Sequence, residues 1–180
     1  MKDVLKFSSK QRVSILINLR EIKEKIIKKE NFYFLIIVLF IFSLDRYTKI
    51  EIINNFSENS FYINDFINFD LVCNTGIGFG LFQSSSSLLY NSISLLIAFV
   101  ILFLIYLLTI SDKLDKISLS LIIGGAIGNF YDRMIFKAVP DFIDLHYKNF
   151  HWFTFNVADI LISLGIIIFL IKGLLESKIK

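Results

Sequence analysis

Long apolar runs restrict what this 180-residue chain can fold into more than any other feature of its sequence. Residues 88–110 contain no charged side chain, and further apolar runs cover residues 32–53, 117–135 and 155–171. A helix needs about 20 mostly apolar residues to cross the hydrocarbon core of a bilayer. The hydrophobic fraction of 55% also exceeds the roughly 45–50% of soluble domains. The sequence therefore predicts an all-α membrane protein, a bundle of four transmembrane helices.

The segment before the first run, residues 1–31, is basic and amphipathic. It holds nine Lys or Arg and four Asp or Glu, with Ile and Leu between them. Such a helix binds the anionic face of a membrane. We predict no nucleic-acid partner, because the basic residues are not interleaved with an aromatic stacking platform. A basic segment followed by 13 apolar residues also describes a secretory signal peptide, but no A-x-A-like cleavage site follows it.

Lysine and arginine are distributed unevenly along the chain. Nine of them lie in the N-terminal extension. Two more, Lys113 and Lys116, lie in the connector after residue 110, and Lys172, Lys178 and Lys180 lie in the C-terminal tail, which gives fourteen. Residues 53–87 hold none. Loops rich in Lys and Arg tend to stay in the cytoplasm. We therefore predict that both termini, including the tail 176–180, are cytoplasmic, and that residues 57–82 and the loop 136–154 face outward.

The outward-facing segment 57–82 differs in pattern from the apolar runs. In INFDLVCN, apolar residues from Ile67 to Cys73 alternate with polar ones, apart from Val72. A two-residue period predicts a half-buried strand or hairpin. The lone cysteine, Cys73, excludes an internal disulfide and is expected to be a small apolar residue of that strand.

Polar residues at the outer ends of the predicted helices form the most informative pattern. Charges at bilayer depth cost roughly 2.5–3.5 kcal/mol each on insertion, so they tend to be paired and functional. The orientation places all such residues at one depth: Asp45 and Lys49 in the first run, Asn129, Asp132 and Arg133 in the third, Asn156 and Asp159 in the fourth, and Asp141 in the loop between those two. Structural ion pairs that tie helices together explain some of them equally well.

Two carboxyl groups in one partly dry site suggest a specific chemistry. They cannot both ionise easily, so one retains its proton, and such a pair can activate water and protonate a leaving nitrogen without a metal. His146 and His151 are five residues apart, with no carboxylate at ligand spacing, so we predict no zinc site. We expect both to be interfacial loop residues, with Tyr147 and Trp152 as aromatic anchors.

With these residues in view, the sequence resembles the bacterial lipoprotein signal peptidase family, also called signal peptidase II. The resemblance covers residues 32–175 and is carried by LDRYTK at 44–49, VCNTGIGFGLF at 72–82, GGAIGNFYDR at 124–133, VPDFIDLH at 139–146 and FNVAD at 155–159. It implies a four-helix bundle with a small outward-facing β-cradle at about residues 57–82. It also implies a protein of the bacterial inner membrane. The orientation predicted from charge puts the active site near the outer leaflet, and we expect a monomer because the bundle needs no partner to assemble the site.

The resemblance further implies a metal-independent aspartic endopeptidase without a cofactor, whose catalytic residues are Asp141 and Asp159. Residues matching the family's supporting or substrate-binding positions are Asp45, Lys49, Asn74, Asn129, Asp132, Arg133 and Asn156. Expected partners are membrane lipids, diacylglyceryl-modified prolipoproteins, cut on the N-terminal side of the lipidated cysteine, and globomycin-type inhibitors. Asp144 is a competing candidate for the first catalytic role, with a solvated loop charge as its simpler interpretation.

The sequence departs from the family's usual pattern in three places. NTGIGF stands where the family usually has NxGAAF, Pro140 stands where an aliphatic residue is common, and the basic N-terminal arm is longer than typical. The first two departures affect the expected shape of the cradle and the fit of inhibitors. A small transporter or proton-relay subunit would also bury Asp, Lys and Arg. However, the polar residues gather at one depth instead of lining a path across the bilayer. A non-catalytic scaffold held by ion pairs is the third class.

Overall fold

The computed structural model describes residues 28–56, 60–76 and 87–179. Most of the predicted N-terminal extension, two stretches of the predicted β-cradle (57–59 and 77–82) and Lys180 lie outside these residues. So does the second half of NTGIGF. The described part consists of α2 (Lys29–Phe56), α3 (Ser87–Ile110), α4 (Lys113–Phe136) and α5 (Val157–Ile179), with a sheet inserted between them. Each of the four apolar runs lies within one of these helices, apart from residues 155 and 156 of the fourth run.

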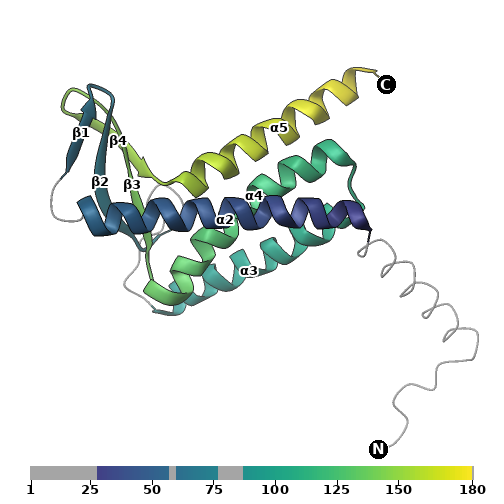
Figure 1. Ribbon diagram of the computed structural model, residues 1–180, viewed down its shortest axis with the longest axis horizontal. Coiled ribbons are helices and arrows are strands. Elements are labelled where there is room, and N and C mark those ends of the chain that lie inside the picture. The colour runs from purple at the N-terminus through teal and green to yellow at the C-terminus, as the bar shows by residue number, and fades with distance from the viewer. Residues whose placement is uncertain (1–27, 57–59, 77–86, 180) are drawn as a thin grey trace, which may run out of the picture.

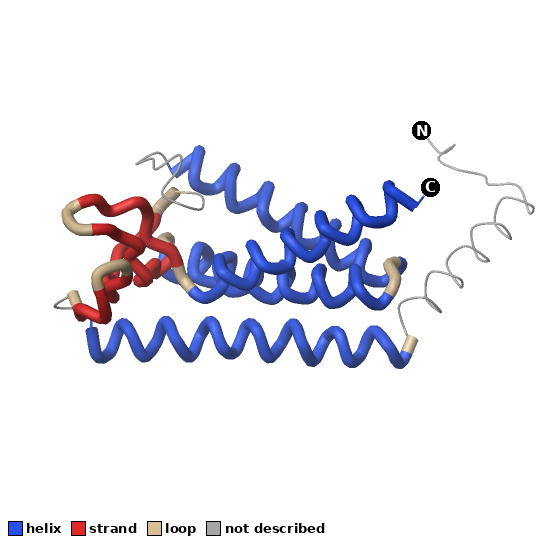
Figure 2. Tube along the Cα trace, turned by 90° about the horizontal axis from the view of Figure 1, so that it is seen from above, coloured by secondary structure: helices blue, strands red, loops and turns tan. Residues whose placement is uncertain are grey.

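The helices run side by side, with the sheet at one end of the bundle and the start of α2 and the end of α5 at the other (Figures 1 and 2). Helix α4 contacts α2, α3 and α5, so it is the central element. Gly124 and Gly128 face α2, where a Cβ atom on Gly124 would lie 2.7 Å from the Cβ of Ile41. The small-xxx-small spacing therefore lets α2 and α4 approach closely.

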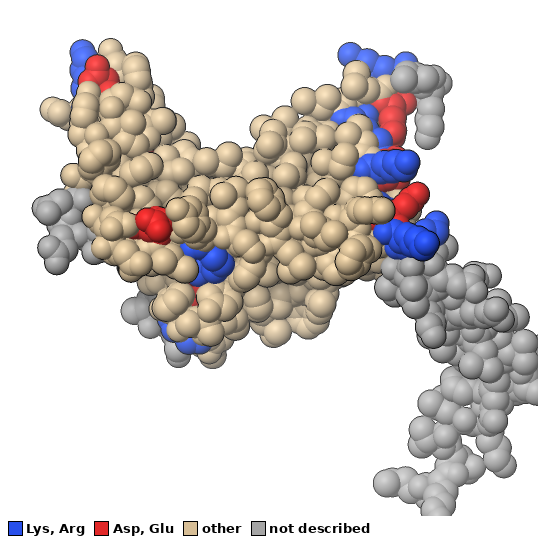
Figure 3. Space-filling model, in the orientation of Figure 1, with Lys and Arg blue, Asp and Glu red and all other residues tan. Residues whose placement is uncertain are grey.

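The outer surface of the bundle is apolar. Helix α3 exposes large side chains such as Leu96, Phe99 and Leu102 along its length. In the space-filling view, charged side chains gather toward the two ends and the stretch between them is largely free of them on the face drawn (Figure 3). The helical segments Leu88–Ile110 and Val157–Lys178 are long and apolar enough to cross a membrane. Apolar patches of this extent are rare on soluble proteins. Four spans remain a prediction.

The sheet has four antiparallel strands in the order β1 (Phe61–Asn64), β2 (Ile67–Asn74), β3 (Val139–Tyr147) and β4 (Phe150–Phe155). The sequence predicted a strand or hairpin only in the part of the sheet formed by residues 57–82, and it predicted a loop for residues 136–154. Instead, β3 pairs with β2 along most of its length and forms a hairpin with β4. The cradle is thus built from two hairpins that are distant in the sequence, a pairing that local pattern does not reveal.

A bulge in β2 reverses the burial expected for its last residues. Phe69 pairs with Ile143 and Val72 with Asp141, so three steps along β2 match two along β3. An extra residue inverts the alternation of side chains beyond it. As a result Cys73 is exposed, contrary to the half-buried position predicted for it, and Asn74 is buried.

Candidate active site

Asp141 is a buried carboxylate in β3 with hydrogen bonds to two asparagine side chains. The side-chain amide of Asn74 donates to Oδ2 at 2.8 Å, and that of Asn156 donates to Oδ1 at 2.6 Å. Asn74 is brought here by the bulge in β2, and its own Oδ1 accepts from the backbone N–H of Gly76 at 2.8 Å. That contact fixes which end of the amide faces Asp141. Asp141 is only 3% exposed.

Asp159 is held at the first turn of α5 by reciprocal contacts with Asn156. The backbone N–H of Asp159 donates to Asn156 Oδ1 at 3.0 Å, and the backbone N–H of Asn156 donates to Asp159 Oδ2 at 3.2 Å. This is the geometry of a capping box, in which the residue before the helix and the third helical residue satisfy each other's free amides. Spacing within FNVAD thus explains both the helix start and the orientation of the carboxylate.

Asn156 therefore joins the two carboxyl groups. Its side-chain N–H bonds Asp141, while its side-chain oxygen and backbone N–H bond Asp159. Because the helix cap fixes its oxygen, the amide group has only its N–H side left for Asp141. Asn156 itself is fully buried.

Burial raises the pKa of Asp141 above its usual value and the negative charge of Asp159 adds to that rise. The pKa is therefore about 6, despite the lowering effect of the hydrogen bonds from Asn74 and Asn156. Desolvation penalises the charged carboxylate, and a second carboxylate nearby penalises it again. An aspartic acid in this setting exchanges its proton near neutral pH, as a general acid or base must.

A cluster of charged side chains between α2 and α4 lies next to Asp141 and Asp159. This ion cluster consists of Asp45, Arg46, Lys49 and Asp132. Lys49 Nζ donates to Asp45 Oδ2 at 2.9 Å, to Asp132 Oδ2 at 2.8 Å and to Asn129 Oδ1 at 2.8 Å. All three ammonium protons thus have acceptors, although Lys49 is 1% exposed. Full pairing is what permits charges to be buried at all.

The ion cluster reaches the carboxyl pair through Asn129. Its oxygen accepts from Lys49 and its amide donates to Asp159 Oδ1 at 2.8 Å. Asp45 makes a second connection, because its Oδ1 accepts from the backbone N–H of Ala158 at 3.3 Å, next to Asp159. Helices α2 and α4 therefore position the start of α5.

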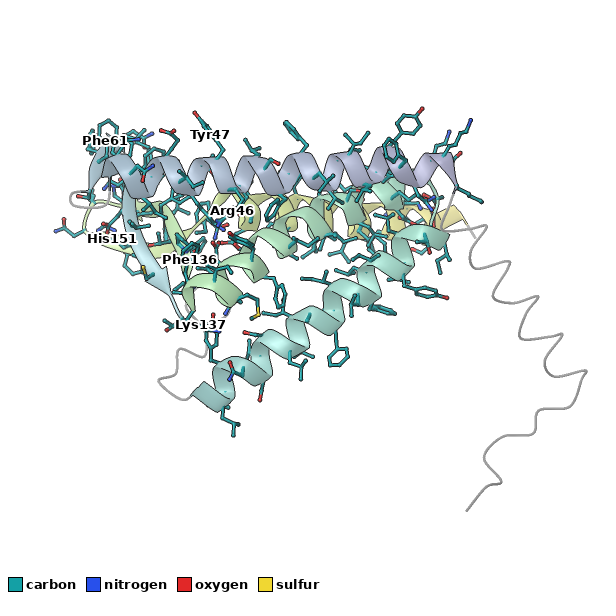
Figure 4. All side chains as sticks on the ribbon, turned by 60° about the horizontal axis from the view of Figure 1, so that its bottom comes forward. Arg46, Tyr47, Phe61, Phe136, Lys137 and His151 are labelled. Carbon is teal, nitrogen blue, oxygen red and sulfur yellow. The ribbon has the colours of Figure 1, made fainter. Side chains whose placement is uncertain are left out.

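Arg46 was not among the residues predicted for the site, yet it makes a two-pronged contact with Asp132. Its Nη1 donates to Asp132 Oδ1 at 2.5 Å and its Nη2 donates to Oδ2 at 3.0 Å. Figure 4 shows Arg46 pointing from α2 toward α4, whereas the adjacent Tyr47 points away from the bundle. The signal was present in the sequence, since Arg46 and Lys49 are i,i+3 and lie on one helix face.

The structure brings together the residues that the sequence analysis singled out around Asp141 and Asp159. Arg133 has a supporting role that acts through the backbone. Its guanidinium donates to the backbone oxygen of Gly76, whose N–H bonds the side chain of Asn74. The buried hydroxyl of Tyr90 donates to the backbone oxygen of Arg133 at 3.0 Å. Arg133 therefore anchors the end of β2 to α4.

Asp144 does not have the place expected of a solvated loop charge. It lies in β3, is 3% exposed, and its Oδ2 contacts His151 Nδ1 at 2.7 Å. Successive side chains of a strand point to opposite faces, so Asp144, three residues after Asp141, points away from it. His146 is also buried rather than interfacial. The expectation failed for both because β3 and β4 form a hairpin where a loop was predicted.

Solved structures define the broad class of protein. The fold is similar to a bacterial membrane enzyme solved by the in meso method at 2.3 Å, with a TM-score of 0.69 and 28% identity, covering 82% of this chain and 91% of that one. A second bacterial membrane enzyme, solved at 1.9 Å, gives a TM-score of 0.65 at 26% identity, covering 79% of this chain and 92% of that one.

Sequence comparisons then identify the family. The family model described as signal peptidase (SPase) II matches residues 37–175. The lipoprotein signal peptidase of Pelagibacter ubique is 45% identical over 158 residues, covering 86% of this chain and 95% of the relative. That of Clostridium tetani is 42% identical over 144 residues, covering 77% and 92%. The chain therefore belongs to the signal peptidase II family, which confirms the resemblance and decides against the transporter alternative.

Proposed function

We propose that this protein is a membrane-bound aspartic endopeptidase that removes signal peptides from lipoprotein precursors, with Asp141 and Asp159 as its catalytic pair. The observation that carries the proposal is the contact of Asn156 with both carboxyl groups. Asp141 is buried in β3 and Asp159 lies in the first turn of α5, so two separate elements supply the two carboxyl groups. Membership of the signal peptidase II family supplies the reaction class.

The chemistry follows from a pair that shares one proton. The ionised carboxylate takes a proton from a water molecule, whose oxygen attacks the peptide carbonyl, while the protonated carboxyl donates a hydrogen bond to the carbonyl oxygen. Collapse of the tetrahedral intermediate breaks the C–N bond, and the proton passes to the leaving nitrogen. Asn74, Asn129 and Asn156 hold the two carboxyl groups in place, which reduces the entropy lost on reaching the transition state.

An apolar groove beside Asp159 fits a lipid-modified substrate. It has a volume of about 430 Å³ and is lined by Phe153, Phe155, Asp159, Ile160, Ser163 and Leu164, among others. The groove runs from β4 along α5, so an apolar chain lying in it meets the carboxyl pair at one end. We propose that substrates are diacylglyceryl-modified and are cut on the N-terminal side of the lipidated cysteine. The relatives' printed name, lipoprotein signal peptidase, agrees with this substrate class.

The proposal includes the location predicted from charge. Four spans, with both termini in the cytoplasm of a bacterium, place the sheet and the carboxyl pair at the outer face of the inner membrane. A monomer holds all the residues of the site, because α2, α4, α5 and the sheet of one chain supply them. Globomycin-type compounds are the proposed inhibitors.

The test is cleavage of a diacylated precursor by the purified protein in the presence of a metal chelator. Asp141→Asn and Asp159→Asn should each abolish cleavage while the protein still inserts and accumulates. Asp144→Asn should have a mild effect, since Asp144 faces away from the pair. Asp70→Asn, at an exposed strand position, is the neutral control. Full activity of either Asp141→Asn or Asp159→Asn rejects the assignment of the pair.

A further inference from the structure

A second group of chemically active side chains lies on the β3–β4 hairpin, outside the carboxyl pair. It consists of Asp144, His146 and His151, here called the histidine cluster. His146 and His151 are directly opposite each other in the strand register, and Asp144 is two residues before His146 on the same face of β3. Each of the three offers one ligand atom, and these atoms all lie within 4.8 Å of one another.

The histidine cluster depends on a bulge in β4. Leu145 pairs with Phe153 and His146 with His151, so Trp152 is the extra residue. Bulges redirect side chains and are common next to functional sites. Without this bulge, the side chains of β4 before Trp152 would lie on the opposite face of the sheet, and His151 would point away from Asp144.

One atom of the histidine cluster is buried without a hydrogen bond. His146 Nδ1 has no partner among the described residues, although the His146 side chain is only 7% exposed. It lies 3.4 Å from Asp144 Oδ2, beyond the length of a good hydrogen bond for this pair. A buried polar atom left unpaired costs about 1–3 kcal/mol. The cost is removed if the nitrogen coordinates a ligand.

We propose that Asp144, His146 and His151 bind a divalent transition metal ion of the kind imidazole prefers, such as Zn²⁺. Two imidazole nitrogens and one carboxylate oxygen form a common zinc ligand set, with water completing the tetrahedron. Ligand atoms at tetrahedral corners around zinc are separated by about 3.3 Å, given bonds of about 2.0 Å. The two Nδ1–Oδ2 separations in the cluster, 2.7 and 3.4 Å, lie on either side of that value.

Metal binding needs one small rearrangement. The two imidazole rings are stacked, with centroids 5.2 Å apart and an interplanar angle of 22°. Nearly parallel rings cannot both direct a lone pair at one ion, so one ring must rotate. His151 can rotate because its side chain is 56% exposed, whereas Asp144 and His146 stay fixed by burial.

The bound ion would join β3 to β4 and take no part in the proposed hydrolysis. Because Asp144 and Asp141 point to opposite faces of β3, the ion and the carboxyl pair occupy different sides of the strand. The sequence predicted no zinc site, since it shows no carboxylate at ligand spacing from the histidines. The hairpin supplies that spacing through tertiary structure.

The experiment titrates Zn²⁺ into the full-length, tag-free protein in detergent, in competition with a chromophoric chelator. A Cys73→Ser background removes the exposed thiol as a zinc ligand. We expect one ion per chain, and an affinity at least about tenfold weaker in His151→Gln, which lacks one ligand. His151→Gln should fold normally because His151 is exposed. Asp144→Asn should weaken binding similarly, and Asp70→Asn should leave it unchanged.

Two further readouts keep the result decisive. Zn²⁺ should raise the melting temperature of the parent protein but not that of His151→Gln, since a ligand stabilises only the state that binds it. Co²⁺ should give the intense visible absorption of a tetrahedral site. Equal zinc affinity in the parent and His151→Gln overturns the proposal. Loss of binding in Asp141→Asn with retention in His151→Gln also overturns it, because the ion would then lie at the carboxyl pair.

Discussion

The close approach of α2 and α4 at Gly128 leads to a quantitative prediction. An added Cβ there would lie 2.4 Å from Asp45 Oδ2 and 3.0 Å from its Cγ. Asp45 cannot simply turn aside, because its two oxygens bond Lys49 and the backbone N–H of Ala158. Gly128→Ala must therefore either separate the helices or break those contacts.

The expected cost combines two effects. Overpacking of a tight interface costs about 1–3 kcal/mol, and each lost hydrogen bond costs about 0.5–1.5 kcal/mol, more where a charge is involved. We expect Gly128→Ala to destabilise the protein by about 2–5 kcal/mol. For a chain of this size that lowers the melting temperature by about 5–15 °C.

The assay is thermal unfolding of the purified protein in one detergent, with Gly173→Ala as the matched control. Gly173 is exposed in α5, and a Cβ there would meet nothing within 4 Å. Helix propensity alone should make Gly173→Ala neutral or more stable by up to about 1 kcal/mol.

A double-mutant cycle separates the carboxylate overlap from helix effects. Asp45→Ala removes the atoms that the new Cβ would meet and leaves the Asp45 Cβ at an ordinary 3.4 Å. Gly128→Ala should therefore cost at least about 1 kcal/mol less in the Asp45→Ala background. If Gly128→Ala unfolds at the same temperature as Gly173→Ala, the packing argument is refuted.

Three further predictions concern the site. Since the pKa of Asp141 is about 6 in the folded protein against an ordinary value of 3.8, folding stability should fall by up to about 3 kcal/mol as pH rises from about 4 to 7. Asp141→Asn should remove that dependence, and an unchanged slope in pH-dependent unfolding would contradict the burial argument. Asn156→Ala should lower kcat about 100-fold with a smaller effect on KM, because both carboxyl groups lose their positioning contact; steady-state cleavage kinetics measure this, and an unaltered kcat would count against it. Lys49→Met should destabilise by about 3–5 kcal/mol by leaving buried carboxylates without their counter-ion, whereas the exposed Lys113→Met should change the melting temperature little; equal melting temperatures for the two variants would show that the ion cluster does not hold α2 to α4.

Local sequence pattern predicted the helices and much of the site. The apolar runs each lie within a helix, apart from the two residues before α5, and the i,i+3 and i,i+4 spacings put Asp45 with Lys49 and Asn156 with Asp159 on shared faces. These relations span less than two helical turns, so backbone geometry alone fixes them. Arg46 stands at i,i+3 from Lys49, so the same spacing also predicts that it lies on the face that carries the ion cluster. Asn129 was predicted as a supporting residue, but its contact with both Lys49 and Asp159 joins three helices and is visible only in the structure.

The sequence by itself therefore determined the apolar helical class of the chain, and it predicted most residues proposed for the candidate site, Arg46 apart. Tertiary structure alone decided how the two hairpins pair, which residue of β2 faces Asp141, and that Asp144 meets His151. The register of β2 against β3 depends on partners about 70 residues apart, and the register of β4 depends on a bulge within its own hairpin; at each bulge one extra residue moves every later side chain to the opposite face. For that reason the bulges that bury Asn74 and turn His151 toward Asp144 leave no trace in the local alternation of the sequence.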